Sequence, residues 1–277
     1  GVLAEPQRTS TPVPTLEDRA MAISDFGTNS AWVRIGTMNP TGPVQTGQFR
    51  DIIARAPDLR NRDAIIIDVR GNSGGVYNWF MAFLRSLYGQ PYADHHARAR
   101  LEITNVMLSP AGSSLPTTPA SAVGGPDAMP PDPPLDAAFV KPEVRPLPGG
   151  ASLTVLRAPD AARRQPGRAP VNPGKARVTA LADYGCASAC ISFVDEMRRF
   201  PGVTLVGTET HVDRRSGGWP EGFELPSGLA TVRMGRMVRE GRRRGENEPW
   251  SPDVRYPGDI ARTDEVKAWI AALIAEK

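Results

Sequence analysis

A serine hydroxyl attacks a carbonyl only when its surroundings activate it, and Ser188 lies where such help is expected. It follows a turn, Tyr184-Gly-Cys-Ala, between a predicted strand at residues 178–183 and a predicted helix at residues 188–200. Unpaired N–H groups at a helix N-terminus favour negative charge, and the N–H of Ala189 would point the same way. A serine at a helix start also commonly serves only as an N-cap, so both interpretations stay open on spacing alone.

A second turn, rich in glycine, is expected beside the first. Residues 64–69 are a continuous apolar run rich in β-branched side chains, typical of a strand buried on both faces of a parallel sheet. The segment Arg-Gly-Asn-Ser-Gly-Gly follows at residues 70–75. Glycine lets a backbone approach closely, so the N–H of Gly74 or Gly75 is a candidate to converge with that of Ala189. Two such groups form an oxyanion hole, although these glycines also fit a plain turn.

Neutral imidazole is the side chain best suited to act as a general base near neutral pH, and the chain has three histidines. His211 follows a predicted strand at residues 203–207, the neighbour of the Ser188 helix, and is therefore the candidate base. The alternative is a solvated loop histidine. His95 and His96 border a proline-rich stretch and are expected on the surface.

Strands alternating with helices must position these groups. The pattern predicts an α/β fold of right-handed βαβ units with a mostly parallel sheet, in which chemistry gathers at the carboxyl ends of the strands. The turns at 70–75 and 184–188 should therefore meet. The predicted strands are 31–36, 64–69, 178–183 and 203–207, a hairpin is predicted at 222–239, and the predicted helices are 46–56, 76–88, 188–200 and one from Thr263 through Ile274.

Composition divides the chain. Residues 109–174 hold 15 of the 28 prolines and a single aromatic residue, and such a stretch buries little apolar surface. We predict a long proline-rich insert or disordered loop there, with one short strand at 151–157. Residues 1–15 are predicted to be a loose N-terminal arm, and residues 16–277 one core domain that carries the insert. The sequence starts without Met, so a processed or trimmed product is expected.

Charge and cysteine content exclude some classes of function. The net charge is +3, and the densest cationic run, six arginines between 233 and 244, is expected on a solvated hairpin or loop rather than in a nucleic-acid site. No apolar run approaches the roughly 20 residues of a membrane span. Cys186 and Cys190 are too few for a structural zinc site, and no metal or cofactor is expected. Two buried thiols are the favoured interpretation, and a disulfide, which would require an oxidising compartment, is the alternative.

Several segments in order resemble the C-terminal processing, or tail-specific, serine proteases, a family that includes the tricorn core and the repeats of interphotoreceptor retinoid-binding protein. The similarity covers about residues 30–90 and 176–275. It implies a crotonase-like and ClpP-like spiral of βαβ units, with Ser188 as nucleophile and Gly74 or Gly75 with Ala189 as oxyanion hole. The matching segments are Asp-Ala-Ile-Ile-Ile-Asp-Val-Arg-Gly-Asn-Ser-Gly-Gly at 63–75, Gly-Cys-Ala-Ser-Ala-Cys at 185–190, Val-Gly-Thr-Glu-Thr at 206–210 and Ser-Pro-Asp-Val at 251–254.

The departures from the family concern the base. The processing proteases carry a lysine where this chain has Asp213, and the tricorn branch uses a histidine where this chain has Arg34, which stays protonated. Tricorn-like members also use a glutamate before the Pro-Asp-Val strand, and Glu246 matches it by spacing, with Glu248 as the near alternative. Glu246 would orient His211 or pair with a nearby arginine.

The resemblance implies a serine endopeptidase that takes peptide or protein substrates, with no nucleic acid as partner. Loss of both family bases favours an alternative, a catalytically impaired member that binds peptide or an apolar ligand in the same cleft. Because bacterial members of the family are mostly exported, a periplasmic or extracellular location is expected.

Overall fold

The computed structural model describes residues 20–97, 103–109, 143–150, 152–157, 167–168, 170–217, 223–225, 227–232 and 237–276. The predicted arm at 1–15 lies outside these ranges, as does part of the predicted insert. In the described part of the chain, no helix has the length and apolar character needed to cross a bilayer.

A six-stranded sheet forms the centre of the fold, in the order β1-β2-β3-β7-β8-β13. β1 is antiparallel to β2, and every other neighbouring pair is parallel. The prediction of an α/β fold with a mostly parallel sheet is confirmed. The strands are β1 Met21–Phe26, β2 Ser30–Ile35, β3 Ala64–Asp68, β7 Arg177–Ala182, β8 Thr204–Gly207 and β13 Val254–Arg255.

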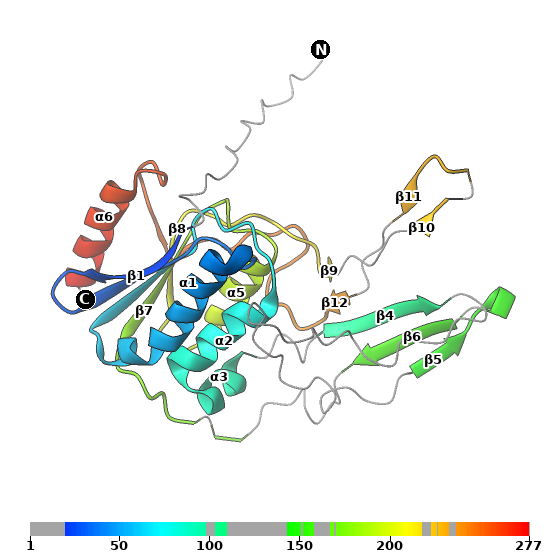
Figure 1. Cartoon of the computed structure of the whole chain (residues 1–277), viewed down its shortest axis with the longest axis horizontal. Helices are drawn as coiled ribbons and strands as arrows, with labels where there is room; N and C mark the ends of the chain where they lie inside the picture. The colour runs from blue at the N-terminus through cyan, green and yellow to red at the C-terminus, as the bar shows by residue number, and fades with distance from the viewer. Residues whose placement is uncertain are drawn as a thin grey trace, which may run out of the picture.

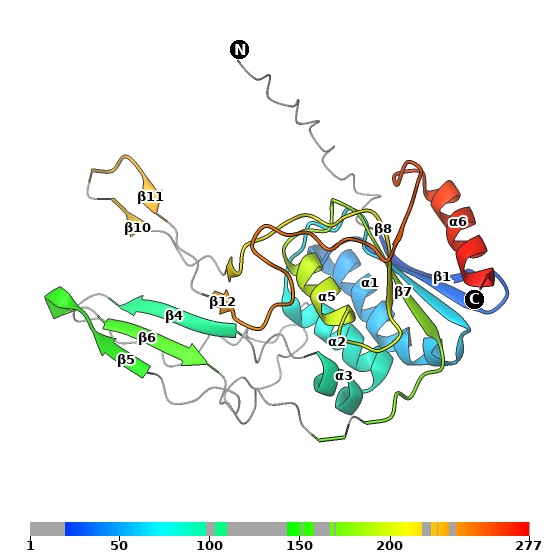
Figure 2. The same ribbon diagram turned by 180° about the vertical axis from the view of Figure 1, so that it is seen from behind.

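Helices cover both faces of this sheet, as Figures 1 and 2 show. Alternate residues of β3 face opposite layers: Ile65 and Ile67 pack with α1, α2, α3 and α5, whereas Ile66 packs with α6. Because both faces of β3 are buried, its sequence is a continuous run of apolar residues. The helices are α1 Gly42–Arg55, α2 Tyr77–Tyr88, α3 Gln90–His96, α5 Ala189–Met197 and α6 Thr263–Ala275, with short 3-10 turns η1 Ala56–Asn61 and η4 Pro148–Gly150.

A second sheet, in the order β5-β6-β4-β12-β9, projects to one side of the core (Figure 1). Its strands are β4 Ile103–Ser109, β5 Glu143–Pro146, β6 Ser152–Arg157, β9 Ser216–Gly217 and β12 Met237–Arg239. The predicted strand at 151–157 is confirmed as β6. The proline-rich segment also supplies β5, which pairs with β6, so its described residues are more ordered than the loop predicted for them.

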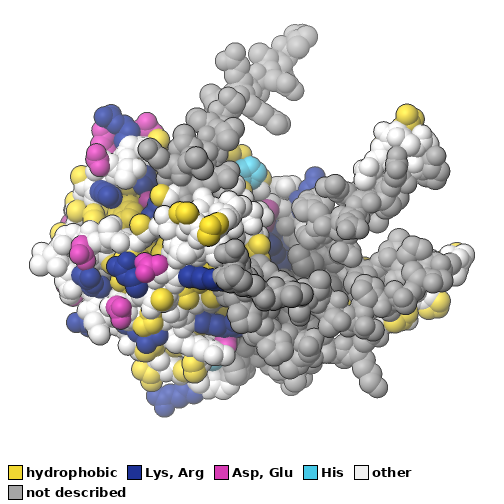
Figure 3. Space-filling view, viewed as in Figure 1, with side chains coloured by type: hydrophobic (Ala, Val, Ile, Leu, Met, Phe, Trp, Pro, Cys, Tyr) yellow, Lys and Arg dark blue, Asp and Glu magenta, His cyan; other side chains and the backbone are white. Residues whose placement is uncertain are grey.

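The predicted hairpin at 222–239 is shorter than expected. β10 Phe223–Glu224 pairs with β11 Thr231–Val232. β12 instead joins β4 and β9 in the second sheet. On the face in Figure 3, cationic and anionic side chains are interspersed over the described part of the core.

Candidate functional site

Ser188 occupies the turn between β7 and α5, and its backbone is unusual. Its φ of 53° and ψ of −118° place a non-glycine residue in a strained region, which persists only where the surroundings enforce it and costs of order 1–3 kcal/mol. Ser188 stands at the N-cap position of α5, yet its side chain makes no capping hydrogen bond. The residue is exposed. Its hydroxyl is thus presented to solvent at a strand-to-helix turn, the type of turn on which serine nucleophiles are held.

Hydrogen bonds fasten this turn to the glycine-rich turn after β3. Asp183 Oδ1 accepts the N–H of Gly71 at 2.8 Å and that of Gly185 at 2.9 Å. Ala187 N–H donates to the Asn72 carbonyl at 3.0 Å. Burial raises the pKa of Asp183, and the two N–H donors act in the opposite direction. The two predicted turns therefore meet, as the parallel arrangement of β3 and β7 requires.

Gly74 and Gly75 have different environments. Gly74 N–H donates to Asn72 Oδ1 at 2.9 Å, so this donor is already used. Gly75 is bridged to Met38 by bonds on either side of it, from Met38 N–H to Gly74 O and from Val76 N–H to Met38 O. The N–H of Gly75 consequently points away from Met38, and it has no hydrogen-bond partner among the described residues.

Ala189 is the first residue of α5, and its N–H is one of the donors that a helix cannot satisfy internally. A β-carbon built on Gly74 would lie 2.8 Å from the Ala189 nitrogen, so the two turns touch at this point. The geometry leaves the N–H groups of Gly75 and Ala189 available, whereas that of Gly74 is bound to a side chain.

His211 is attached to the Ser188 turn through its backbone. Its N–H donates to the Cys186 carbonyl at 3.1 Å, and its ring packs on Tyr184 with centroids 4.8 Å apart. Nδ1 lies 2.6 Å from the Val212 carbonyl oxygen. Because a carbonyl can only accept, Nδ1 carries a proton, and in the neutral imidazole Nε2 is then the acceptor. No hydrogen bond joins His211 to Ser188 in the described structure, and catalytic hydrogen bonds often form only with substrate bound.

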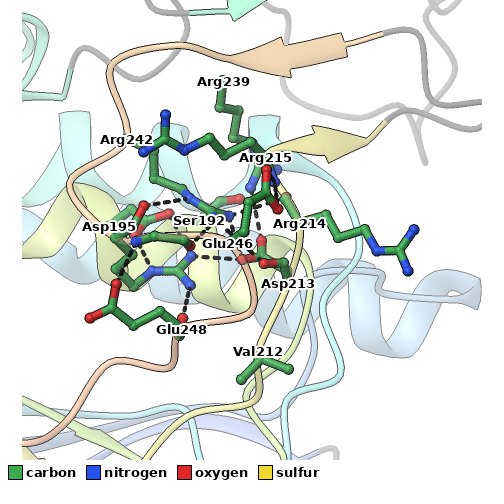
Figure 4. Close-up of polar contacts among 12 residues, drawn as sticks. Ser192, Asp195, Val212, Asp213, Arg214, Arg215, Arg239, Arg242, Glu246 and Glu248 are labelled. Atoms are coloured by element: carbon green, nitrogen blue, oxygen red, sulfur yellow. Dashed lines mark hydrogen bonds and ion pairs between the residues drawn. The ribbon is translucent and has the colours of Figure 1, made fainter.

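Asp213, which the sequence comparison with the family predicts at the lysine position, is the centre of a charged cluster (Figure 4). Its carboxylate contacts Arg239 at 3.1 Å, Arg242 at 2.6 Å and Arg244 at 3.0 Å. Arg244 also forms a two-pronged pair with Asp195 of α5, at 2.9 and 3.2 Å. Burial opposes the charge of Arg244, but hydrogen bonds and charges of Asp195 and Asp213 raise its pKa.

This cluster corrects the expectation that the arginine run is solvated. Arg242 and Arg244 are buried, because carboxylates and backbone carbonyls satisfy their guanidinium groups. Arg243 is exposed, as predicted for the run, and Arg214 points away from the cluster in Figure 4. The buried arginines tie α5 to the loop that carries His211.

Glu246 binds the backbone of Arg215, so it is not placed to orient the His211 ring. Both carboxylate oxygens accept the backbone N–H of Arg215, at 3.1 and 3.0 Å. Among the described contacts none joins Glu246 to His211. Glu248 accepts the N–H of Gly245. Both glutamates are exposed and fasten loops.

Arg34 is bound by neighbouring groups, and the two remaining histidines are buried or partly buried. Arg34 donates to the Arg70 carbonyl at 2.7 Å and pairs with Asp68 at 3.4 Å. The surface location expected for His95 and His96 is wrong. His95 is buried and His96 partly buried, because α3 packs its aromatic side against the core. Burial lowers the pKa of His96.

Cys186 and Cys190 form a disulfide, so the favoured interpretation of two free thiols is wrong. A bridge between two cysteines that both lie within one regular helix would be geometrically awkward. Only Cys190 lies in α5, and Cys186 belongs to the preceding turn, which brings the two Cα atoms to 5.2 Å, a spacing that a bridge needs. Among the described residues no group of three or more potential metal ligands is gathered.

Sequence reasoning missed the residues that fasten the site. Asn72 and Asp183 hold the two turns together, and asparagine and aspartate within glycine-rich turns are a recognisable signal for such side chain to backbone bonds. The pairing of Asp195 with Arg244 had no signal, because 49 positions separate the two residues.

An exposed, uncapped serine at a strained strand-to-helix turn in an α/β domain is an arrangement that serine hydrolases use. The sequence matches the model of peptidase family S41 over residues 29–256, and the chain belongs to this family. The resemblance to processing proteases is thereby confirmed at the level of the family, and a peptidase activity is what this membership supports.

Solved structures of similar proteins show low similarity to this chain. Mature CPAF is 16% identical with a TM-score of 0.47, over 93% of this chain and 55% of that one. The photosystem II D1 C-terminal processing protease is 13% identical with a TM-score of 0.37, over 82% and 42%. The tricorn protease is 16% identical with a TM-score of 0.39, over 90% and 18%. This chain therefore spans little more than half, or less, of these proteins. Curated protein sequences gave no match.

Proposed function

We propose that this chain is a serine endopeptidase of the C-terminal processing type, acting on peptide or protein substrates. The observation that carries the proposal is the exposed hydroxyl of Ser188, held uncapped on a strained turn against Gly74. A residue kept there only as an N-cap would use its side chain to bind the helix N-terminus. The Ser188 hydroxyl makes no such bond, so it is free to act as a nucleophile.

In this mechanism Ser188 Oγ attacks the substrate carbonyl carbon while Nε2 of His211 accepts the hydroxyl proton. The N–H groups of Gly75 and Ala189 donate to the oxyanion. Collapse of the intermediate expels the amine, which takes the proton from His211 and leaves an acyl-serine ester. A water molecule, deprotonated by His211, then hydrolyses this ester and restores the serine.

Glu246 has a supporting role in the proposal. By accepting the N–H of Arg215, it fixes the end of the segment that begins at His211. In this mechanism substrate binding must bring His211 within hydrogen-bond distance of Ser188, because a general base acts only at that distance.

A fluorophosphonate probe tests the assignment of the nucleophile. We expect it to label the wild-type protein at Ser188, identified by mass spectrometry of the modified peptide, and to leave Ser188→Ala unlabelled. Ser192→Ala is the matched control, because Ser192 lies one turn further along α5 and its Oγ contacts the Ser188 carbonyl at 3.4 Å. Peptidase activity that survives Ser188→Ala would refute the mechanism.

A second candidate is a catalytically impaired family member that binds peptide or an apolar ligand in the same cleft. The observation favouring it is that Asp213, the residue expected at the position of the family lysine, is neutralised by arginines. In addition, no hydrogen bond joins His211 to Ser188 among the described residues. A folded protein that neither reacts with fluorophosphonate nor cleaves peptides, but binds a peptide library in fluorescence polarisation, would select this candidate.

The proposed location is periplasmic or extracellular. The bridge between Cys186 and Cys190 supports it, because disulfides persist in oxidising compartments. Fractionation of the native host followed by thiol alkylation would test both statements. Recovery of the protein in a reducing compartment with two free thiols would contradict them.

A further inference from the structure

The disulfide encloses the candidate nucleophile. Cys186 and Cys190 stand two residues before and two residues after Ser188, so the bridge closes a small loop with the serine at its middle. Both cysteines are fully buried, whereas Ser188 is exposed. The bridge therefore lies on the inner side of the turn that presents the hydroxyl outward.

The same bridge connects to the other parts of the site. The carbonyl of Cys186 accepts the N–H of His211 at 3.1 Å, and the N–H of Cys190 donates to the Ala187 carbonyl at 3.0 Å. Cys190 Sγ lies 3.8 Å from the carbonyl oxygen of Val69, the residue directly after β3. One covalent link thus holds the turn of the nucleophile and the attachment of the base, and it lies beside the end of the strand before the glycine-rich turn.

The conformation of Ser188 needs such support. A non-glycine residue at φ 53° and ψ −118° is costly by about 1–3 kcal/mol and is kept only where its neighbours fix it. Tight van der Waals contact with Gly74 acts from one side, and the bridge fixes both ends of the five-residue segment from the other. Without the bridge, the backbone of Ser188 could adopt the unstrained conformation of an ordinary helix N-terminus.

Resting on the proposed function, we propose that Cys186 and Cys190 are positioning residues, whose disulfide holds Ser188 and His211 in their reactive relationship, so that reduction of the bridge lowers the activity. A dithiol reductant cleaves the Sγ–Sγ bond, delivers two electrons and two protons to give two thiols, and is itself oxidised to a cyclic disulfide. Reoxidation reverses the change, which makes the activity dependent on the redox state of the compartment.

The experiment compares oxidised protein, protein reduced with dithiothreitol and Cys186→Ala/Cys190→Ala, each checked by mass spectrometry for its thiol count and by circular dichroism for its fold. We expect the rate of fluorophosphonate labelling, and kcat on a peptide, to fall by about 100-fold on reduction, the cost of a displacement near 1 Å. KM should change much less, and reoxidation should restore the rate. The double variant should be slow in both conditions.

Amide hydrogen exchange provides the readout that does not depend on activity. Reduction should increase exchange at the peptides containing residues 186–190 and His211, while exchange in β3 stays unchanged. Equal labelling rates with and without the bridge would overturn the proposal. If the oxidised protein is unreactive, the proposed function fails by itself, and the exchange data decide the positioning role: faster exchange supports it, and unchanged exchange overturns it.

Discussion

Gly74 lies so close to Ser188 that a β-carbon at position 74 would be 2.8 Å from the Ser188 Cβ and 2.7 Å from the Ala187 carbonyl oxygen. These separations are shorter than normal van der Waals contacts, so a side chain does not fit at position 74 unless its neighbours move. The requirement for glycine arises from the close packing of two turns that are more than 100 residues apart in the sequence. The N–H of Gly75, the next residue, is not used in the bridge to Met38.

Gly74→Ala should therefore separate the two turns. Because the added methyl group meets backbone atoms and because φ is +101°, we expect a loss of unfolding free energy of about 1–3 kcal/mol and a fall in labelling rate of about 100-fold or more. Gly27→Ala is the control, since Gly27 also has a positive φ, of +62°, but has no atom within 4 Å of the added position. Urea unfolding and fluorophosphonate kinetics measure the two effects. Equal labelling of the two variants would contradict the packing argument.

His211→Ala should lower the rate of peptide hydrolysis by about 100- to 10,000-fold, the range for loss of a general base. Loss of the proton acceptor should act on kcat more than on KM, because the imidazole contacts the reacting proton and not the remote parts of a peptide. Arg214→Gln is the control from the same loop, since its side chain is exposed and points away from the cluster (Figure 4). A rate unchanged in His211→Ala would show that the base is another group, even if Ser188 is the nucleophile.

Local pattern was enough for β2, β3, β7 and β8 of the central sheet, but it gave no prediction of β1, and β13 was expected only from the family resemblance. Strands such as Ala64–Asp68 are buried on both faces, so the apolar run alone marked them. The proline-rich segment was harder to interpret, because β5 and β6 gain their order from pairing with each other and with β4. Composition reports how much apolar surface a segment can bury, and it does not report which strand edge a segment can join.

The meeting of the Ser188 turn with the Gly74-Gly75 turn could be predicted, because it follows from the parallel order of β3 and β7. The candidate site was not predictable where a side chain is satisfied by a distant partner. Arg242 and Arg244 looked like solvated charge because the sequence does not reveal that Asp195 and Asp213 face them. For the cysteines, the deciding fact was where α5 begins, and helix boundaries are set within one or two residues only by the three-dimensional structure.

Asp183 should give the fold a pH dependence of known sign. Burial raises its pKa in the folded protein above the unfolded value, which is about 4, so the stability it contributes is present at low pH and is lost as pH rises through the folded pKa. Asp183→Asn keeps an Oδ1 acceptor for Gly71 and Gly185 and cannot ionise. Relative to wild type, this variant should become more stable as pH increases from about 4 to 7.

Asp183→Ala is the comparison for this prediction, because it removes the acceptor as well as the charge. It should be destabilised at both pH values by about 1–3 kcal/mol for each N–H group left without a partner. Urea unfolding at the two pH values checks both variants. A relative stability of Asp183→Asn that falls with increasing pH would show that the N–H donors outweigh burial.

Arg244 and Arg243 are adjacent in sequence and opposite in environment, which makes them a matched pair for the last prediction. Arg244 is buried and joins Asp195 to Asp213, whereas Arg243 is exposed and donates to the backbone carbonyl of Arg198. Arg244→Met should lower the unfolding free energy by about 3–5 kcal/mol, because two carboxylates lose a buried partner. Arg243→Met should change it by about 0.5 kcal/mol or less.

The same pair separates stability from positioning. Asp195 belongs to the helix that starts after Ser188, and Asp213 lies two residues after His211, so Arg244 fixes the base loop to the nucleophile helix. Labelling of Arg244→Met at a temperature where the variant remains folded by circular dichroism should still be slower than that of Arg243→Met. If the two folded variants are labelled equally fast, the cluster stabilises the fold without setting the geometry between Ser188 and His211.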